Sequence, residues 1–157
     1  MSRASPQPRG GAAVGQLGSL PPLEAGAVVN FRHWFSGPDA RAQLRADFED
    51  TLGPAAGQAA FETFGTLCNF CATHGRRPLV RHGLTCVCLG ADEACFANLV
   101  AAAAEGAEDD ARLLAALIVR PAEAPALAEL AAHYADLLHQ PLPPLQQAAV
   151  PLARTLH

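Results

Sequence analysis

Residues 54–73 read PAAGQAAFETFGTLCNFCAT, and this stretch decides the fold class that the sequence predicts. Its larger apolar side chains recur at three- and four-residue spacings, the period of one face of a helix. The members of this stripe are Phe61, Phe64, Leu67, Cys68 and Cys71. We therefore expect a helix that begins near Pro54 and ends at about Thr73.

The same reasoning predicts further helices on both sides of this stretch. Before it, the Ser36-Gly37-Pro38 sequence is typical of a helix start, and Gly53 and Pro54 end that helix. After it, the expected helices cover residues 92–105, 108–119 and 125–139. The sequence thus predicts an all-α fold, a compact bundle of about five helices. A short irregular or extended segment that carries cysteines is expected between the second and third helices.

The length of 157 residues fits one domain with a real core. Residues 1–27 are rich in Gly, Pro and Ser and are expected to form a disordered tail. Residues 28–140 are expected to form the single helical domain, which VVNFRHWF opens. Residues 141–157 contain several prolines and are expected to form a C-terminal tail.

Composition and charge exclude several classes of function. All 11 basic residues are arginine, so a P-loop and Schiff-base chemistry, which need lysine, are excluded. The net charge of -4 argues against nucleic acid as a partner. No stretch approaches the roughly 20 apolar residues that a membrane span needs. We expect a cytoplasmic protein of undetermined oligomeric state, and a binding role more than an enzymatic one.

Five cysteines lie between residues 68 and 95 and are the feature most suggestive of chemistry. They form a CxxC pair, a CxC pair and one further thiol, with two histidines between the pairs. The candidate ligands are Cys68, Cys71, Cys86, Cys88, Cys95, His74 and His82. Two short-spaced pairs on either side of a connector are the usual way in which a chain supplies four ligands to zinc. We therefore expect a Cys/His metal site, with zinc as the metal.

The cysteine pattern also leaves alternatives open. The thiols of the CxxC pair lie on an apolar stripe and could be buried, reduced core residues. A thiol-redox or iron-sulfur accessory role would use Cys86, Cys88 or Cys95. Cys95 falls in the first turn of an expected helix, where the helix dipole favours a thiolate. Pairing of Cys95 with His74 or His82 for hydrolase chemistry is disfavoured, because nothing in the sequence orients such a pair.

The connector GRRPLVRH, residues 75–82, carries three arginines and no acid. Arg76, Arg77 and Arg81 can contact a partner or an anion through bidentate guanidinium hydrogen bonds. They can equally lie in solvent or balance the charge of nearby thiolates. We expect a protein partner, with the metal fixing the connector so that its arginines face that partner. A helical adaptor without any ligand is the remaining alternative.

The region from NFRHWFSGPDA through GRRPLVRHGLTCVCLGADEACF resembles small bacterial proteins that share a GRRPLxRH stretch followed by CxC and DExCF. The resemblance covers residues 28–139. It implies a cytoplasmic bacterial domain, and it attaches no activity, ligand or partner to any residue.

Overall fold

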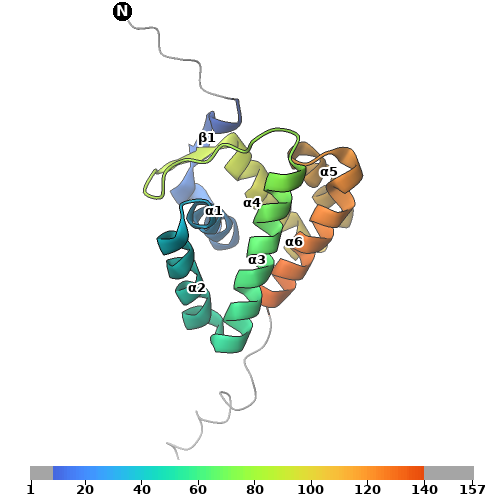
Figure 1. Ribbon diagram of the computed structural model, residues 1–157. Coiled ribbons are helices and arrows are strands. Elements are labelled where there is room, and N and C mark those ends of the chain that lie inside the picture. The colour runs from blue at the N-terminus through green and yellow to red at the C-terminus, as the bar shows by residue number, and fades with distance from the viewer. Residues whose placement is uncertain (1–8, 140–157) are drawn as a thin grey trace, which may run out of the picture.

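Helices make up most of the chain between residues 9 and 139, the part that this computed structural model describes (Figure 1). Within these residues the α-helices are α1 (Pro22–Trp34), α2 (Pro38–Leu52), α3 (Pro54–His74), α4 (Ala91–Ala104), α5 (Glu108–Ile118) and α6 (Ala124–Leu138). A small antiparallel sheet pairs β1 (Ala13–Gln16) with β2 (Cys88–Gly90). The all-α prediction is confirmed, with six helices instead of about five in this region.

Proline and glycine define the helix boundaries as expected. Pro22, Pro38 and Pro54 stand in the first turns of α1, α2 and α3, where the missing N–H costs nothing. Gly37 and Gly53 precede α2 and α3 with φ angles of 101° and 90°, a backbone conformation that favours glycine. The expected capping role of Ser36 is not observed, since Gly37 is the N-cap and the Ser36 hydroxyl donates to the carbonyl of Arg32.

The core lies where α3, α4 and α6 meet. The ring of Phe64 lies 6.0 Å from that of Phe96 and 5.0 Å from that of Tyr134, measured between centroids. Phe31 extends the aromatic contacts to α1, at 4.8 Å from Phe96. The few aromatic residues of the chain are thus concentrated at the helix crossings, where large rings contribute most burial per side chain.

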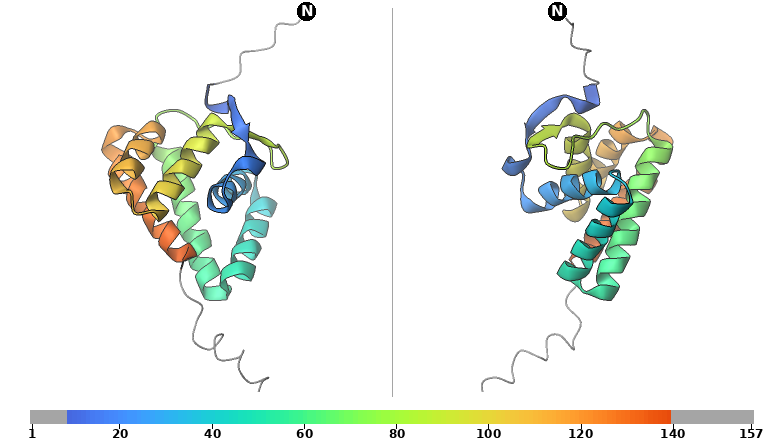
Figure 2. Two further views of the ribbon diagram at one scale, coloured as in Figure 1. Left: turned by 180° about the vertical axis from the view of Figure 1, so that it is seen from behind. Right: turned by 60° about the vertical axis from the view of Figure 1, so that its left-hand side comes forward.

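The prediction of a disordered tail over residues 1–27 is wrong from Arg9 onward. Residues 13–16 form β1, and α1 begins at Pro22 in place of the apolar entry expected at Val28. Figure 2 shows this N-terminal segment lying against β2 and the start of α4. Composition alone failed here because the order comes from pairing with distant residues, such as Ala13 with Gly90. Residues 1–8 lie outside the described part.

The other boundaries agree closely with the sequence. The helices predicted over 54–73, 108–119 and 125–139 are α3, α5 and α6, and the extended segment predicted at LTCVCL is in part β2. None of the helices described between residues 9 and 139 is long and apolar enough to cross a membrane. The tail predicted over residues 141–157 lies outside the described residues.

Candidate functional site

The connector runs across the amino end of α4 and is held there by Asp92. Arg77 donates to both carboxylate oxygens of Asp92, with N–O distances of 2.8 and 2.7 Å. The backbone N–H of Val80 donates to the same carboxylate at 2.7 Å. Asp92 lies in the first turn of α4 and fixes a segment from outside that helix, so Arg77 has a structural partner.

The next residue of α4, Glu93, together with Arg32 of α1 anchors the end of the connector and the segment that follows it, residues 83–90. Both side chains are 0% exposed, and Glu93 accepts from Arg32 Nε at 2.8 Å and from Nη2 at 2.9 Å. Glu93 also accepts the backbone N–H groups of His82 and Gly90. The remaining guanidinium donors of Arg32 bond three carbonyls, those of Gly83, Cys86 and Cys88. All five N–H donors of this arginine are therefore used.

These contacts set the charge state of the pair. Burial by itself would raise the pKa of Glu93, but hydrogen bonds from Arg32, Gly90 and His82 outweigh it and lower that pKa below its usual value. The hydrogen bond to Glu93 raises the pKa of Arg32, although burial opposes this. The two groups therefore remain charged inside the protein. Each compensates the desolvation cost of the other.

Sequence reasoning did not identify this pair. Arg32 lies within the apolar run VVNFRHWF, and a charged residue in such a run signals either a helix edge or a buried ion pair. That signal cannot name the partner, because Glu93 is 61 positions away. Only the tertiary structure brings the two together.

The cysteines fall into two separate environments. Cys68 and Cys71 are buried in the core cluster that also contains Phe64 and Phe96. Burial raises the pKa of Cys71 to about 12 and that of Cys68 well above its usual value. Cys95 is partly buried, with its Sγ 3.8 Å from the carbonyl of Leu114. These three thiols are held in the protonated form.

The expectation that the helix dipole favours a thiolate at Cys95 is therefore wrong. Burial raises the pKa of this thiol, and the negative charge of Asp92 raises it further. The positive charge of Arg77 lowers it, but by less than the other two effects together. The carboxylate that fixes the connector thus works against ionisation of the neighbouring thiol.

The other candidate ligands lie on the connector and its flanks. Cys86 and His82 contact each other, with Cys86 Sγ 3.6 Å from His82 Nδ1. His74 ends α3, where its ring lies 4.3 Å from that of Phe70 and its Nδ1 3.9 Å from Glu123 Oε1. Across residues 9–139, no three or more His, Cys, Asp or Glu side chains are grouped so that they could hold a metal ion. The residues as placed do not form a ligand set, and zinc or iron-sulfur binding stays a prediction of the sequence.

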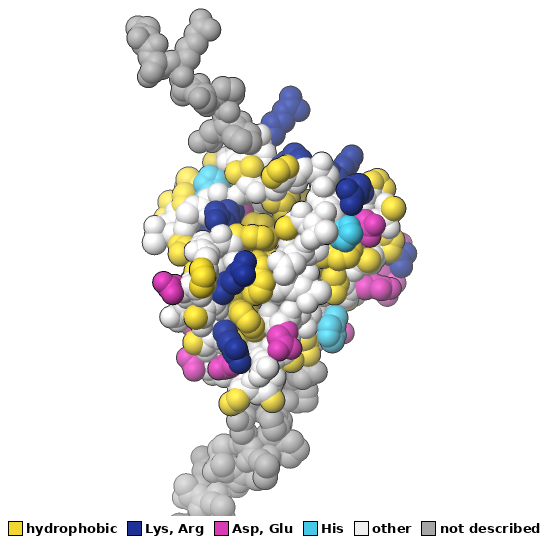
Figure 3. All heavy atoms as spheres, in the orientation of Figure 1, with side chains coloured by type: hydrophobic (Ala, Val, Ile, Leu, Met, Phe, Trp, Pro, Cys, Tyr) yellow, Lys and Arg dark blue, Asp and Glu magenta, His cyan; other side chains and the backbone are white. Residues whose placement is uncertain are grey.

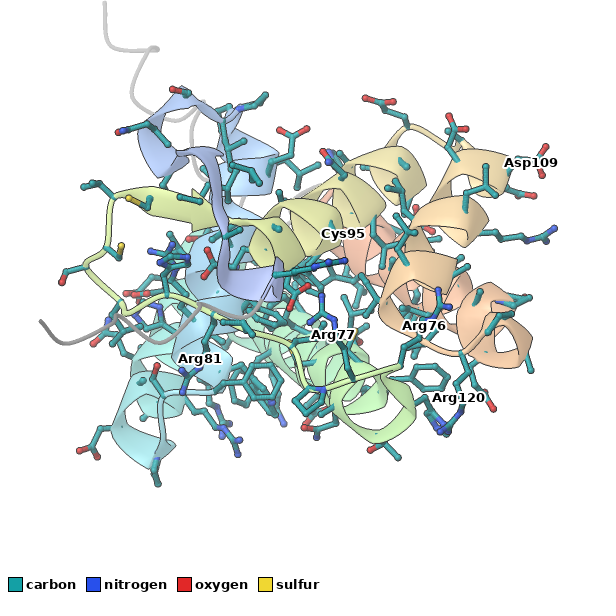
Figure 4. The ribbon with its side chains drawn as sticks, turned by 90° about the horizontal axis from the view of Figure 1, so that it is seen from above. Arg76, Arg77, Arg81, Cys95, Asp109 and Arg120 are labelled. Atoms are coloured by element: carbon teal, nitrogen blue, oxygen red, sulfur yellow. The ribbon has the colours of Figure 1, made fainter. Side chains whose placement is uncertain are left out.

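A groove of about 770 Å³ lies beside the connector. Phe35 and Leu79 contribute apolar surface over the buried Phe31 ring. Arg76, Arg77 and Arg81 follow one another along the wall of the groove (Figure 4). In the space-filling view, arginine side chains (dark blue) lie beside exposed apolar surface (yellow) on the face shown (Figure 3). The structure therefore brings the three candidate arginines to one cavity.

The arginines of the groove differ in their partners. Arg77 is paired with Asp92, whereas Arg76 donates to the carbonyl of Ala116 at 3.0 Å and Arg81 donates to the carbonyl of Phe35. Neither Arg76 nor Arg81 has a carboxylate oxygen within ion-pair distance among the described residues. Two guanidinium charges on the groove are thus left without a counter-ion.

Comparisons with models of known protein families, with curated proteins and with solved structures found no match.

Proposed function

We propose that this protein is a small cytoplasmic, non-enzymatic binding module whose groove takes an acidic segment of a partner protein. The observation that carries the proposal is the pair of uncompensated guanidinium groups, Arg76 and Arg81, on an apolar groove. A positive charge beside apolar surface fits a segment in which carboxylates flank a large apolar side chain.

The size of the groove supports a peptide as the occupant. A volume of about 770 Å³ is that of a site for several side chains or a medium-sized ligand. Phe35 is partly exposed at one side of it and offers an aromatic surface, which the buried ring of Phe31 supports from 5.0 Å away. An apolar side chain of the partner would contact the Phe35 ring while its carboxylates reach the guanidinium groups.

The rigid attachment of the connector supports the same function. Arg77 is fixed by Asp92, and the backbone of Val80 is fixed by the same carboxylate. The wall of the groove is thus held before any ligand arrives, which lowers the entropic cost of binding. In this proposal the ion pairs Arg77–Asp92 and Arg32–Glu93 at the start of α4 hold the connector in place, the role that the sequence analysis gave to a metal.

A protein partner is favoured over nucleic acid. The chain has a net charge of -4, which repels an extended phosphate backbone at long range. A short acidic peptide meets only the local positive charge of the groove. All five cysteines are free thiols, the state that a reducing compartment maintains, and this supports a cytoplasmic location.

The test uses a panel of synthetic peptides that carry Phe or Trp flanked by Glu, together with the same peptides with Gln in place of Glu. Fluorescence anisotropy should show salt-sensitive binding of the acidic peptides only. A charge-assisted hydrogen bond is worth about 1.5–3 kcal/mol. The double variant Arg76→Ala/Arg81→Ala should therefore raise Kd at least about tenfold.

Arg112→Ala is the matched control, since Arg112 is exposed on α5 and does not line this groove. It removes one positive charge from the chain and should leave Kd unchanged. Equal binding of acidic and amide peptides, or none by either, would overturn the proposal. So would tighter binding of a single-stranded oligonucleotide that is lost in the same double variant.

A further inference from the structure

A second arrangement of reactive groups lies where the connector meets the N-terminal segment. Cys86 Sγ lies 3.6 Å from His82 Nδ1, and the other ring nitrogen, Nε2, lies 2.9 Å from the carbonyl oxygen of Gly11. A carbonyl can only accept a hydrogen bond, so Nε2 carries the proton. In the neutral ring Nδ1 is then an acceptor, and it faces the thiol. The Cys86 thiol, the His82 imidazole as its base and the Gly11 carbonyl that orients the base therefore contact one another in that order.

The buried ion pair fixes both members of this arrangement. The backbone N–H of His82 donates to Glu93 at 2.9 Å, and the backbone carbonyl of Cys86 accepts from Arg32 at 2.6 Å. Gly90 leaves room for the imidazole, since a Cβ at that position would lie 2.8 Å from His82 Cδ2. The thiol-imidazole contact is thus preorganised by buried groups.

Access and a second thiol complete the site. Cys86 and His82 are both half-buried, in contrast to the fully buried thiols of the core. Cys88 lies two residues further along, and its carbonyl accepts from the same guanidinium group as that of Cys86. Val87, between them, is 65% exposed, whereas Cys86 and Cys88 are both partly buried, which is the alternation of side chains along an extended segment. Cys86 and Cys88 therefore share a face.

We propose that Cys86 is a nucleophilic thiol that reacts with hydroperoxides, with His82 as its base and Cys88 as its resolving thiol. The proton of the Cys86 thiol passes to His82 Nδ1. The sulfur attacks one peroxide oxygen, an S–O bond forms and the O–O bond breaks. The sulfur is oxidised by two electrons to a sulfenic acid, and the departing oxygen leaves as water or an alcohol after taking the proton from His82.

The second step consumes the sulfenic acid. The thiol of Cys88 attacks the oxidised sulfur of Cys86, an S–S bond forms and the S–O bond breaks, and the hydroxyl leaves as water with the proton of Cys88. The product is a Cys86–Cys88 disulfide in the segment that follows the connector. The peroxide supplies both oxidising equivalents, so no other reactant is needed.

The test exposes the full reduced chain to less than one equivalent of hydrogen peroxide. A 1,3-dione then traps sulfenic acid, an alkylating agent blocks the remaining thiols, and peptide mass spectrometry reads each cysteine. Cys86 should be oxidised at least about tenfold faster than Cys95, and faster than the same thiol in urea-unfolded chain. The Cys88→Ser variant should keep this first step and accumulate the trapped sulfenic acid. In the unaltered chain, the peptide that contains both thiols should instead lose the mass of two hydrogens, because the disulfide forms.

His82→Ala should lower the oxidation rate of Cys86 about tenfold or more, because a positioned base is commonly worth at least that factor. His74→Ala is the matched histidine control and should leave the rate unchanged, since His74 lies at the end of α3 among Phe70, Arg120 and Glu123. If His82→Ala fails to fold, the comparison of folded with urea-unfolded chain decides. The proposal would be overturned if Cys86 were oxidised no faster in the folded chain than in the unfolded chain. It would also be overturned if the oxidation rate of Cys86 did not depend on His82.

Discussion

Arg32 of α1 and Glu93 of α4 form an ion pair in which both side chains are 0% exposed, and its contacts fix the chain from His82, the last residue of the connector, to Cys88. The pair joins α1 to α4 and to the segment that leads into α4, which lie 51 to 61 positions further along the chain. Removing one partner leaves the other as an uncompensated charge inside the protein, which costs far more than the pair contributes relative to apolar residues.

Glu93→Gln should therefore lower the free energy of unfolding by about 3–5 kcal/mol. The substitution preserves the shape of the side chain, removes its charge and turns one acceptor oxygen into an NH2 group that faces N–H donors, so Arg32 stays buried without a counter-ion. Urea unfolding followed by circular dichroism measures the change. Glu49→Gln is the matched control, because the Arg45–Glu49 pair is exposed on α2, and it should change stability by less than about 1 kcal/mol. Similar effects of the two substitutions would contradict the central role of the buried pair.

The same carboxylate predicts how stability depends on pH. The pKa of Glu93 in the folded protein is below its usual value of 4.5. Its stabilising contribution is therefore fully present above that value and is lost as the pH falls through the lower, folded-state pKa. The difference in unfolding free energy between the unaltered chain and Glu93→Gln should shrink as the pH falls below about 4.5. Urea unfolding at a series of acidic pH values measures it, and a difference that stays constant would contradict the prediction.

The helices could be predicted from the sequence because their signals are local. The three- and four-residue spacing around Phe64 and the Gly-Pro pair at residues 53–54 act within a few residues of one another. The ordered N-terminal segment could not be predicted, because it is Gly-rich and its order depends on contacts with residues about 80 positions away. Gly10, for example, lies against Asp92 and Arg77 so closely that no Cβ would fit.

The candidate site could be predicted only in part, for a similar reason. The spacing of the connector arginines predicts that they act together, and the structure places all three on one groove. Spacing cannot distinguish Arg77, which has a carboxylate partner, from Arg76, which has none. Spacing also could not separate the core thiols from Cys86 and Cys88, because the burial of a cysteine depends on how the helices pack.

Arg77 and Arg76 are adjacent, but replacing the first should mainly lower stability, whereas replacing the second should mainly weaken peptide binding. Arg77→Ala removes the partner of Asp92, whose side chain is only 8% exposed, and should cost about 1–3 kcal/mol of stability. Arg76→Ala removes an exposed guanidinium and should change stability by less than about 0.5 kcal/mol while weakening peptide binding. Thermal melts and the anisotropy assay separate the two effects. Equal losses of stability would show that both arginines are structural.

The close approach of α2 and α3 depends on Gly57. A Cβ at this position would lie 2.5 Å from the Cα of Glu49 and 2.6 Å from the carbonyl oxygen of Phe48, and backbone atoms cannot move aside cheaply. Gly57→Ala should therefore cost about 1–3 kcal/mol of stability. Gly26→Ala is the control within a helix, because a Cβ there meets nothing within 4 Å. It should raise stability by about 0.5–1 kcal/mol, and the opposite order of the two melting temperatures would contradict this packing.

The environments of the thiols predict a two-phase reaction with a maleimide reagent at neutral pH. Cys86 and Cys88 are partly exposed and should be labelled in the folded protein, whereas Cys68 and Cys71 are fully buried and should be labelled only when the chain unfolds. The pKa of Cys71, about 12, leaves almost no thiolate to react. Peptide mass spectrometry after labelling with and without urea assigns each thiol to its phase. Labelling in the presence of a chelator distinguishes burial from metal coordination as the cause of protection. Thiols protected by burial stay unreactive when the chelator is added. Labelling of Cys68 and Cys71 with the chelator under native conditions would show that a metal ion, not the core, protects them.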